Sequence, residues 1–112
     1  MSGTNGGRDQ DEAPRVSGGV DPCKKTRLGP INSPKASVLS PLAKGAVLDV
    51  AIQMSGTTPI LVVKDGSGAV GGSLTFVGYL EIIGCIRDHG VQYKATIVNI
   101  SGGVYEVRVE PI

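Results

Sequence analysis

Cys85 and His89 are the residues of this chain whose types and spacing come nearest to a catalytic or metal-binding pair. They lie four positions apart in a segment with helical periodicity, so both would point from one helix face. A thiolate and an imidazole placed in this way can form half of a zinc site, or a cysteine nucleophile with its base. A complete zinc site needs further ligands, for which only Cys23 or Asp88 is available, and no third group is evident for catalysis. We therefore expect a packed cysteine, an exposed histidine, no metal and no enzyme.

A glycine-rich run at residues 64–72 is the second segment to test for chemistry, because such runs can cradle a phosphate. A phosphate loop leads from a strand into a helix and ends in Gly-Lys-Ser or Gly-Lys-Thr. This run instead joins two strand-like segments, and its Asp65-Gly66 dipeptide is typical of a turn. We interpret it as a hairpin turn and expect no cofactor.

The elements that would position these residues follow the order βββ-α-ββ, which predicts a mainly β fold, a small five-stranded barrel of the OB type with one helix. Alternating or continuous apolar residues mark the strands, and apolar residues at three- and four-residue spacings mark the helix. The strands are expected at 46–53, 59–64, 69–74, 91–100 and 105–110, and the helix runs from about residue 76 to a C-terminal cap at Gly90.

The same periodicities predict which side chains form the core. The run Ile60–Val63 is apolar throughout, which indicates burial on both faces, and Gly71-Gly72 indicates a bend or bulge. Ser73 or Thr75 is expected to cap the helix. The other predicted core side chains are Leu48, Val50 and Ile52, then Phe76, Tyr79, Leu80, Ile83 and Ile86 of the helix, and Tyr93, Ala95, Ile97, Tyr105, Val107 and Val109.

Residues 1–32 form a low-complexity N-terminal arm rich in Gly, Ser, Asp, Arg and Pro. This composition buries too little apolar surface to fold alone, so the arm is either disordered or ordered by a partner. In the second case Lys24, Lys25 and Arg27 would serve as a small basic anchor. Residues 33–45 are expected to form a short helical lid or linker, and residues 46–112 form the barrel domain.

Composition limits the classes of partner and the cellular compartment that we expect for this protein. The 112 residues carry a net charge of +1, and the barrel region has no cluster of Lys and Arg of the kind a phosphate-binding surface needs. Cys23 and Cys85 show no disulfide framework. There is no apolar signal segment after Met1 and no run long enough to span a bilayer. We expect a soluble cytoplasmic protein without a membrane partner, and no small-molecule substrate is evident.

The barrel region resembles the HIRAN family, a DNA-binding variant of the small β-barrel, and is also similar to small bacterial proteins of the same layout. The HIRAN resemblance implies a nucleic-acid-binding barrel, and no binding residue is transferred from it. It covers most of residues 45–110 and consists of the strand 60–63, then Val70-Gly71 leading to Leu74, the segment Gly90–Val98, Gly102-Gly103 and the strand 107–109.

Two functions remain open. The first is a non-catalytic assembly module that binds a protein partner or itself, with an N-terminal arm that wraps the partner and an exposed edge on the glycine-broken strand 69–74. The alternative is single-stranded nucleic-acid binding, for which Tyr79, Tyr93 and Tyr105 are the stacking candidates, although all three are expected in the core. The candidate partner-binding residues are Lys24, Lys25 and Arg27 in the arm, Ser55 and Thr57 in one loop, and Gly102 and Gly103 in another.

Overall fold

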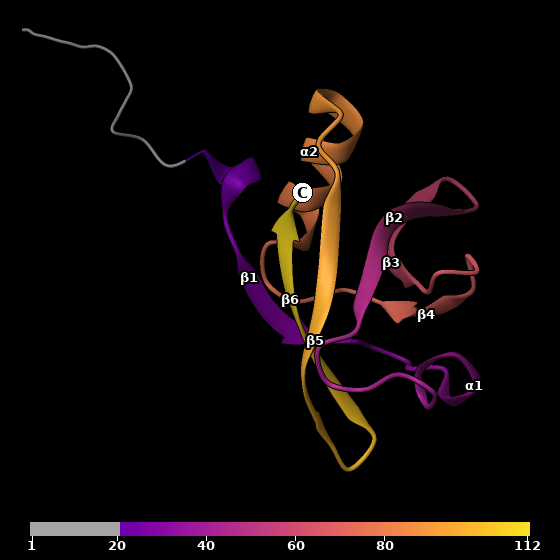
Figure 1. Cartoon of the computed structure of the whole chain (residues 1–112). Helices are drawn as coiled ribbons and strands as arrows, with labels where there is room; N and C mark the ends of the chain where they lie inside the picture. The colour runs from indigo at the N-terminus through magenta and orange to yellow at the C-terminus, as the bar shows by residue number, and fades with distance from the viewer. Residues whose placement is uncertain (1–20) are drawn as a thin grey trace, which may run out of the picture.

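A computed structural model describes residues 21–112 of the chain (Figure 1). Two short helical segments, six strands and one longer helix make up this part. In chain order they are η2 (Pro22–Lys24), β1 (Arg27–Pro30), α1 (Ala36–Leu39), β2 (Val47–Ser55), β3 (Thr58–Lys64), β4 (Val70–Ser73), α2 (Tyr79–His89), β5 (Tyr93–Ser101) and β6 (Val104–Pro111).

The six strands form one antiparallel sheet with the order β1-β6-β5-β2-β3-β4. Its two end strands, β1 and β4, are not paired with each other, and an isolated bridge joins Ser73 of β4 to Asn32, two residues after β1. The mainly β fold with one main helix is confirmed, but the prediction of a closed five-stranded barrel was wrong. The added strand, β1, lies between the end of β6 and the bridge to β4, where a five-stranded barrel would close directly.

The second correction concerns the N-terminal segment. Of the predicted arm 1–32, residues 21–32 belong to the sheet and its surroundings, because Arg27–Pro30 pairs with Glu106–Val109 of β6. Residues 1–20, on which the wrapping of a partner was predicted, lie outside the described residues. In the predicted lid 33–45, α1 is a single turn that inserts the fully buried Leu39 against Gly71.

The core confirms most of the predicted faces. Leu61, Val62 and Val63 are all buried, as their continuous apolar run predicts.

Leu80 is the exception on the helix, because 65 % of it is exposed. The helix begins only at Tyr79, after Gly78 in a left-handed conformation without a side-chain cap, so its buried residues are Ile82, Ile83 and Cys85. Neither Ser73 nor Thr75 is the cap. The buried cluster consists of Ile31, Leu39, Leu48, Leu61, Val63, Leu74, Ile82, Ile83, Cys85, Tyr93, Ala95, Ile97, Val107 and Val109.

Glycines in β1 and β4 allow the chain to approach itself closely. A Cβ on Gly29 would overlap the ring of Phe76, and a Cβ on Gly72 would overlap Ile31 and the carbonyl of Asn32. The pairing of β3 with β4 also shifts register between Val63 and Lys64. The predicted irregularity at the Gly71-Gly72 pair therefore corresponds to close packing of residues 31–39 on β4.

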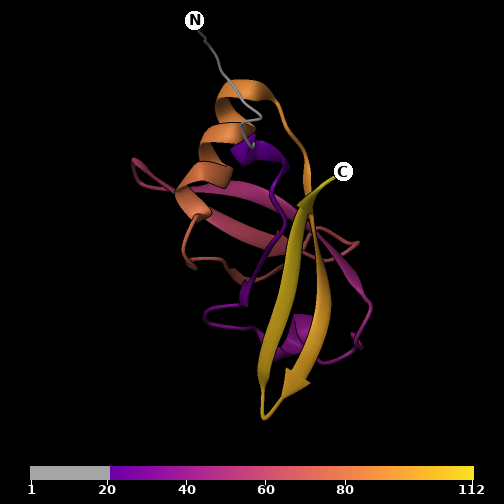
Figure 2. The same cartoon turned by 90° about the vertical axis from the view of Figure 1, so that its left-hand side faces the viewer.

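The β5–β6 and β2–β3 hairpins end in two-residue turns that need glycine. Gly102 and Gly103 have φ values of 57° and 80°, which is the pattern of a type I′ turn. Gly56 has a φ of 63° and Thr57 does not have a positive φ, which is the pattern of a type II′ turn. Figures 1 and 2 show the two tips pointing in different directions. Within residues 21–112, no helix has the length and apolar character needed to cross a membrane.

We expect Gly103→Ala to lower the free energy of unfolding by about 1–2 kcal/mol, because an L-residue is disfavoured in the left-handed conformation. The matched control is Gly66→Ala. Both glycines have open space where a Cβ would stand, but only Gly103 has a positive φ. The control should leave stability unchanged or raise it slightly. Urea unfolding followed by circular dichroism measures both, and equal losses would contradict the turn assignment.

Candidate functional site

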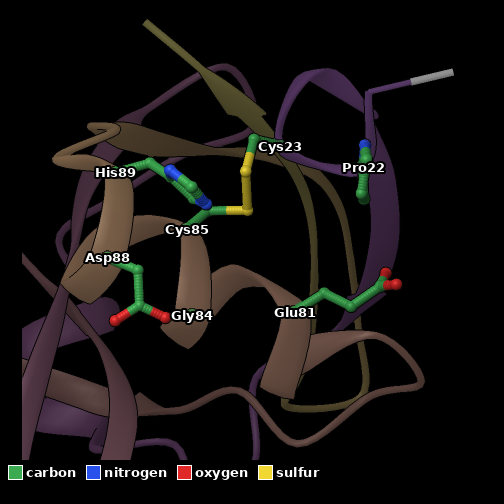
Figure 3. Close-up of a pocket in the computed structure, with 7 residues that line it drawn as sticks. All are labelled: Pro22, Cys23, Glu81, Gly84, Cys85, Asp88 and His89. Atoms are coloured by element: carbon green, nitrogen blue, oxygen red, sulfur yellow. A yellow bond between two sulfur atoms is a disulfide. The ribbon is translucent and has the colours of Figure 1, made fainter. Parts of the chain in front are cut away.

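The pair Cys85 and His89 lies on α2 beside a groove that η2 and α2 form together (Figure 3). Cys85 is bonded to Cys23 in a disulfide that spans 62 residues of sequence. The prediction that these cysteines show no disulfide framework was therefore wrong. A disulfide sulfur is neither a thiolate ligand nor a nucleophile, so the half zinc site and the Cys–His pair do not exist in the oxidised protein.

Three other ionisable side chains line the groove. Glu81, Asp88 and His89 line it together with Pro22, Gly84 and the two cysteines. Over the part of the chain that the structure describes, no three His, Cys, Asp or Glu side chains are grouped so that they could hold a metal ion. Cys85 is buried and His89 is exposed at the end of α2, which agrees with the packing interpretation of this pair.

Three contacts tie the N-terminal segment to α2 and β5, and we call them together the N-terminal clasp. The first is the Cys23–Cys85 disulfide. In the second, the hydroxyl of Tyr93 donates a hydrogen bond to the carbonyl oxygen of Cys23 at 2.7 Å. Burial raises the pKa of this phenol, which keeps the donor protonated. The third is an ion pair between Arg27 Nη2 and Glu81 Oε1 at 2.6 Å.

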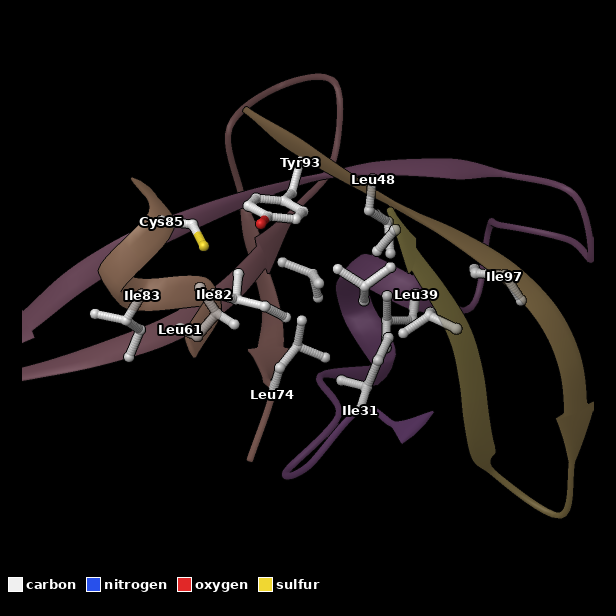
Figure 4. Close-up of a cluster of buried hydrophobic side chains, with 14 residues drawn as sticks. Ile31, Leu39, Leu48, Leu61, Leu74, Ile82, Ile83, Cys85, Tyr93 and Ile97 are labelled. Carbon is white, nitrogen blue, oxygen red and sulfur yellow. The ribbon is translucent and has the colours of Figure 1, made fainter. Parts of the chain in front are cut away.

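The clasp is anchored in the core. Figure 4 shows Cys85 and Tyr93 among the side chains of the buried cluster. The side chain of Arg27 is only 12 % exposed, and its guanidinium also donates to the carbonyl of Pro22. Arg27 is thus engaged within the chain, while Lys24 and Lys25 of the predicted basic anchor are exposed. Within residues 21–112, neither lysine takes part in an ion pair.

The structure does not bring the seven predicted partner-binding residues together. Lys24, Lys25 and Arg27 lie beside α2, Ser55 and Thr57 at the tip of the β2–β3 hairpin, and Gly102 and Gly103 at the tip of the β5–β6 hairpin. Both views place these three regions apart (Figures 1 and 2). Among the stacking candidates, Tyr93 is buried in the clasp, and Tyr79 and Tyr105 are half-buried against the core.

Strand edges provide a different candidate surface. The predicted open edge on the glycine-broken strand is covered, because Asn32 and Ser73 exchange backbone hydrogen bonds and the N–H of Lys35 donates to the carbonyl of Gly71. The edge of β6 is covered by β1. On β2, by contrast, only Val47–Asp49 pairs with β5, and the pairing ends there.

Within the part of the chain that the structure describes, residues 50–55 of β2 consequently have one strand neighbour, β3, and an edge without a strand on the other side. Figure 1 shows β2 and β3 leaving the β5–β6 hairpin toward a separate tip. We call residues 50–55 the open β2 edge. Its sequence is Val-Ala-Ile-Gln-Met-Ser, which carries no charge, and Met54 is 56 % exposed. In the described residues, it is the longest stretch of strand that has a strand neighbour on one side only.

Sequence reasoning missed β1, the disulfide and the open β2 edge. An even number of cysteines was the only sequence signal for the disulfide.

Comparisons of this chain with protein-family models, with curated proteins and with solved structures found no significant match in any of the three.

We expect loss of the disulfide to lower the free energy of unfolding by about 4 kcal/mol, because the bond closes a long loop in the unfolded chain. The Cys23→Ser/Cys85→Ser variant and the wild-type protein in dithiothreitol should unfold at the same lower urea concentration. Dithiothreitol should not affect the double variant. Two reactive thiols in the native, untreated wild-type protein would contradict the disulfide.

Proposed function

We propose that this chain is a non-catalytic protein-binding module whose partner adds a strand to the open β2 edge. The edge itself supports the proposal. An unpaired row of backbone donors and acceptors is a template for another strand, and alternate side chains then select the partner. The exposed thioether of Met54 adds an adaptable apolar contact at the end of the same strand.

The charge distribution also favours a protein partner over a nucleic acid. Lys24 and Lys25 lie at the end of η2 and directly after it, and not in the open β2 edge, which carries no charge. Nucleic-acid binding depends on clustered cations and exposed aromatic rings. The HIRAN resemblance and nucleic-acid binding stay predictions. The disulfide favours an oxidising compartment over the predicted cytoplasm, since cytosolic thiols are kept reduced.

We expect a fluorescently labelled single-stranded oligonucleotide not to bind this protein at physiological salt, as measured by fluorescence anisotropy. Binding that weakens steeply as salt rises would overturn the proposal and support the nucleic-acid alternative. In that case Lys24→Ala/Lys25→Ala should abolish binding, while the control Lys35→Ala/Lys44→Ala, which removes two other exposed cations, should not.

A further inference from the structure

We propose that the strand added to the open β2 edge is the same strand of a second copy, so that two chains pair β2 to β2 in antiparallel fashion about a two-fold axis. This inference rests on the proposed function and names its partner. It is carried by the hydrogen-bond alternation of β2, by the absence of charge along the edge and by the contrast with the other edges of the sheet.

The alternation follows from the pairing with β3. Ser55 and Thr58 flank a two-residue turn and form a hydrogen-bonded pair, and such pairs alternate along an antiparallel ladder. Met54 lies opposite Pro59, which has no N–H to donate. Ala51, Gln53 and Ser55 therefore bond to β3. The N–H and C=O groups of Val50, Ile52 and Met54 point to the open side.

The β2 strand of a second copy has the same outward-pointing backbone groups, so the two strands can form hydrogen bonds with each other. In an antiparallel pair, residues that point to the shared side lie opposite one another and exchange both hydrogen bonds. Ile52 then lies opposite Ile52 or Met54 of the second copy. The even-numbered side chains of both chains also share one face, so Val50, Ile52 and Met54 would form a continuous apolar strip across the two copies.

Charge does not oppose this self-pairing. Like charges directly opposite each other destabilise a strand pair, and a symmetric pair brings each strand's charges close to their own copies. Residues 50–55 carry none. The nearest charged residue of β2 is Asp49, which pairs with Lys94 of β5 and Lys64 of β3 and so lies where β5 already occupies the edge.

The other edges of the sheet carry features that keep sheets from pairing, and the open β2 edge has none. β1 is four residues long and ends in Pro30, and β3 has Pro59 near its start. β5 has a register shift between Ile97 and Asn99, and residues 32–35 cover β4. Charges, prolines, bulges and short strands are the devices that protect monomeric edges. The open β2 edge has none of these protective features, and we therefore infer that a partner strand covers it when the protein functions.

The test measures molar mass by size-exclusion chromatography with light scattering over a range of protein concentrations. We expect the wild-type protein to reach twice the chain mass of 11.5 kDa as concentration rises. Met54→Lys should weaken the dimer about tenfold or more, because each copy brings a charge into the shared apolar strip. Val104→Lys is the matched control, since Val104 is also 56 % exposed and also lies at a hairpin end, and it should dimerise like wild type.

Amide hydrogen exchange at several concentrations separates failure of this inference from failure of the proposed function. Protection of Ile52 and Met54 that increases with concentration, with Ala51 and Gln53 always protected, supports the β2 pair. A monomer at all concentrations with fast exchange at Ile52 and Met54 overturns the second copy and leaves the edge open to another protein. A monomer with slow exchange there overturns both proposals. Equal loss of dimer in the two lysine variants overturns the β2 interface.

Discussion

The attachment of residues 21–32 to the rest of the chain is the constraint on which the architecture depends. Without residues 27–32, the outer edge of β6 would lose β1 and Ser73 of β4 would lose its bridge to Asn32. β1 itself is short and contains Gly29 and Pro30, so its own hydrogen bonds are few. The N-terminal clasp supplies the missing stability through a covalent bond, a buried tyrosine hydrogen bond and an ion pair.

The clasp also accounts for two residues near the start of α2, the glycine before the helix and the acidic residue in its first turn. Gly78 lies directly against the guanidinium of Arg27, where any Cβ would overlap Nη1, and Glu81 in the first helical turn receives the same guanidinium. An acidic residue in the first turn is favourable for the helix dipole as well. Arg27 thus contacts both the residue before α2 and the first turn of the helix. The helix begins three residues later than its apolar spacing predicts, directly after Gly78, whose φ of 98° is not that of a right-handed helix.

The residues that could be predicted are those whose environment is set by a local period. Ala95, Val107 and Val109 alternate with polar neighbours, and all three are buried. The features that could not be predicted are set by distant partners. Arg27–Pro30 is a strand because it pairs with β6, which is distant in the sequence. Cys23 and Cys85 are likewise distant in the sequence, and the fold brings them close enough to form a disulfide. The open β2 edge was missed for the same reason. Whether a strand edge is paired depends on distant strands, which the local pattern of residues 50–55 does not reveal.

The pairing of β1 with β6 also constrains the order in which the chain can fold. β1 precedes every other described strand, and its only strand partner, β6, follows all of them. During synthesis, residues 27–30 must therefore wait until nearly the whole described chain has been made. Contacts of such large sequence separation form slowly. Until then β1 has no strand partner, whereas Cys23 and Cys85 both precede β6 in the chain. A chaperone, or early formation of the disulfide, would therefore have its greatest effect on this protein before β6 is complete.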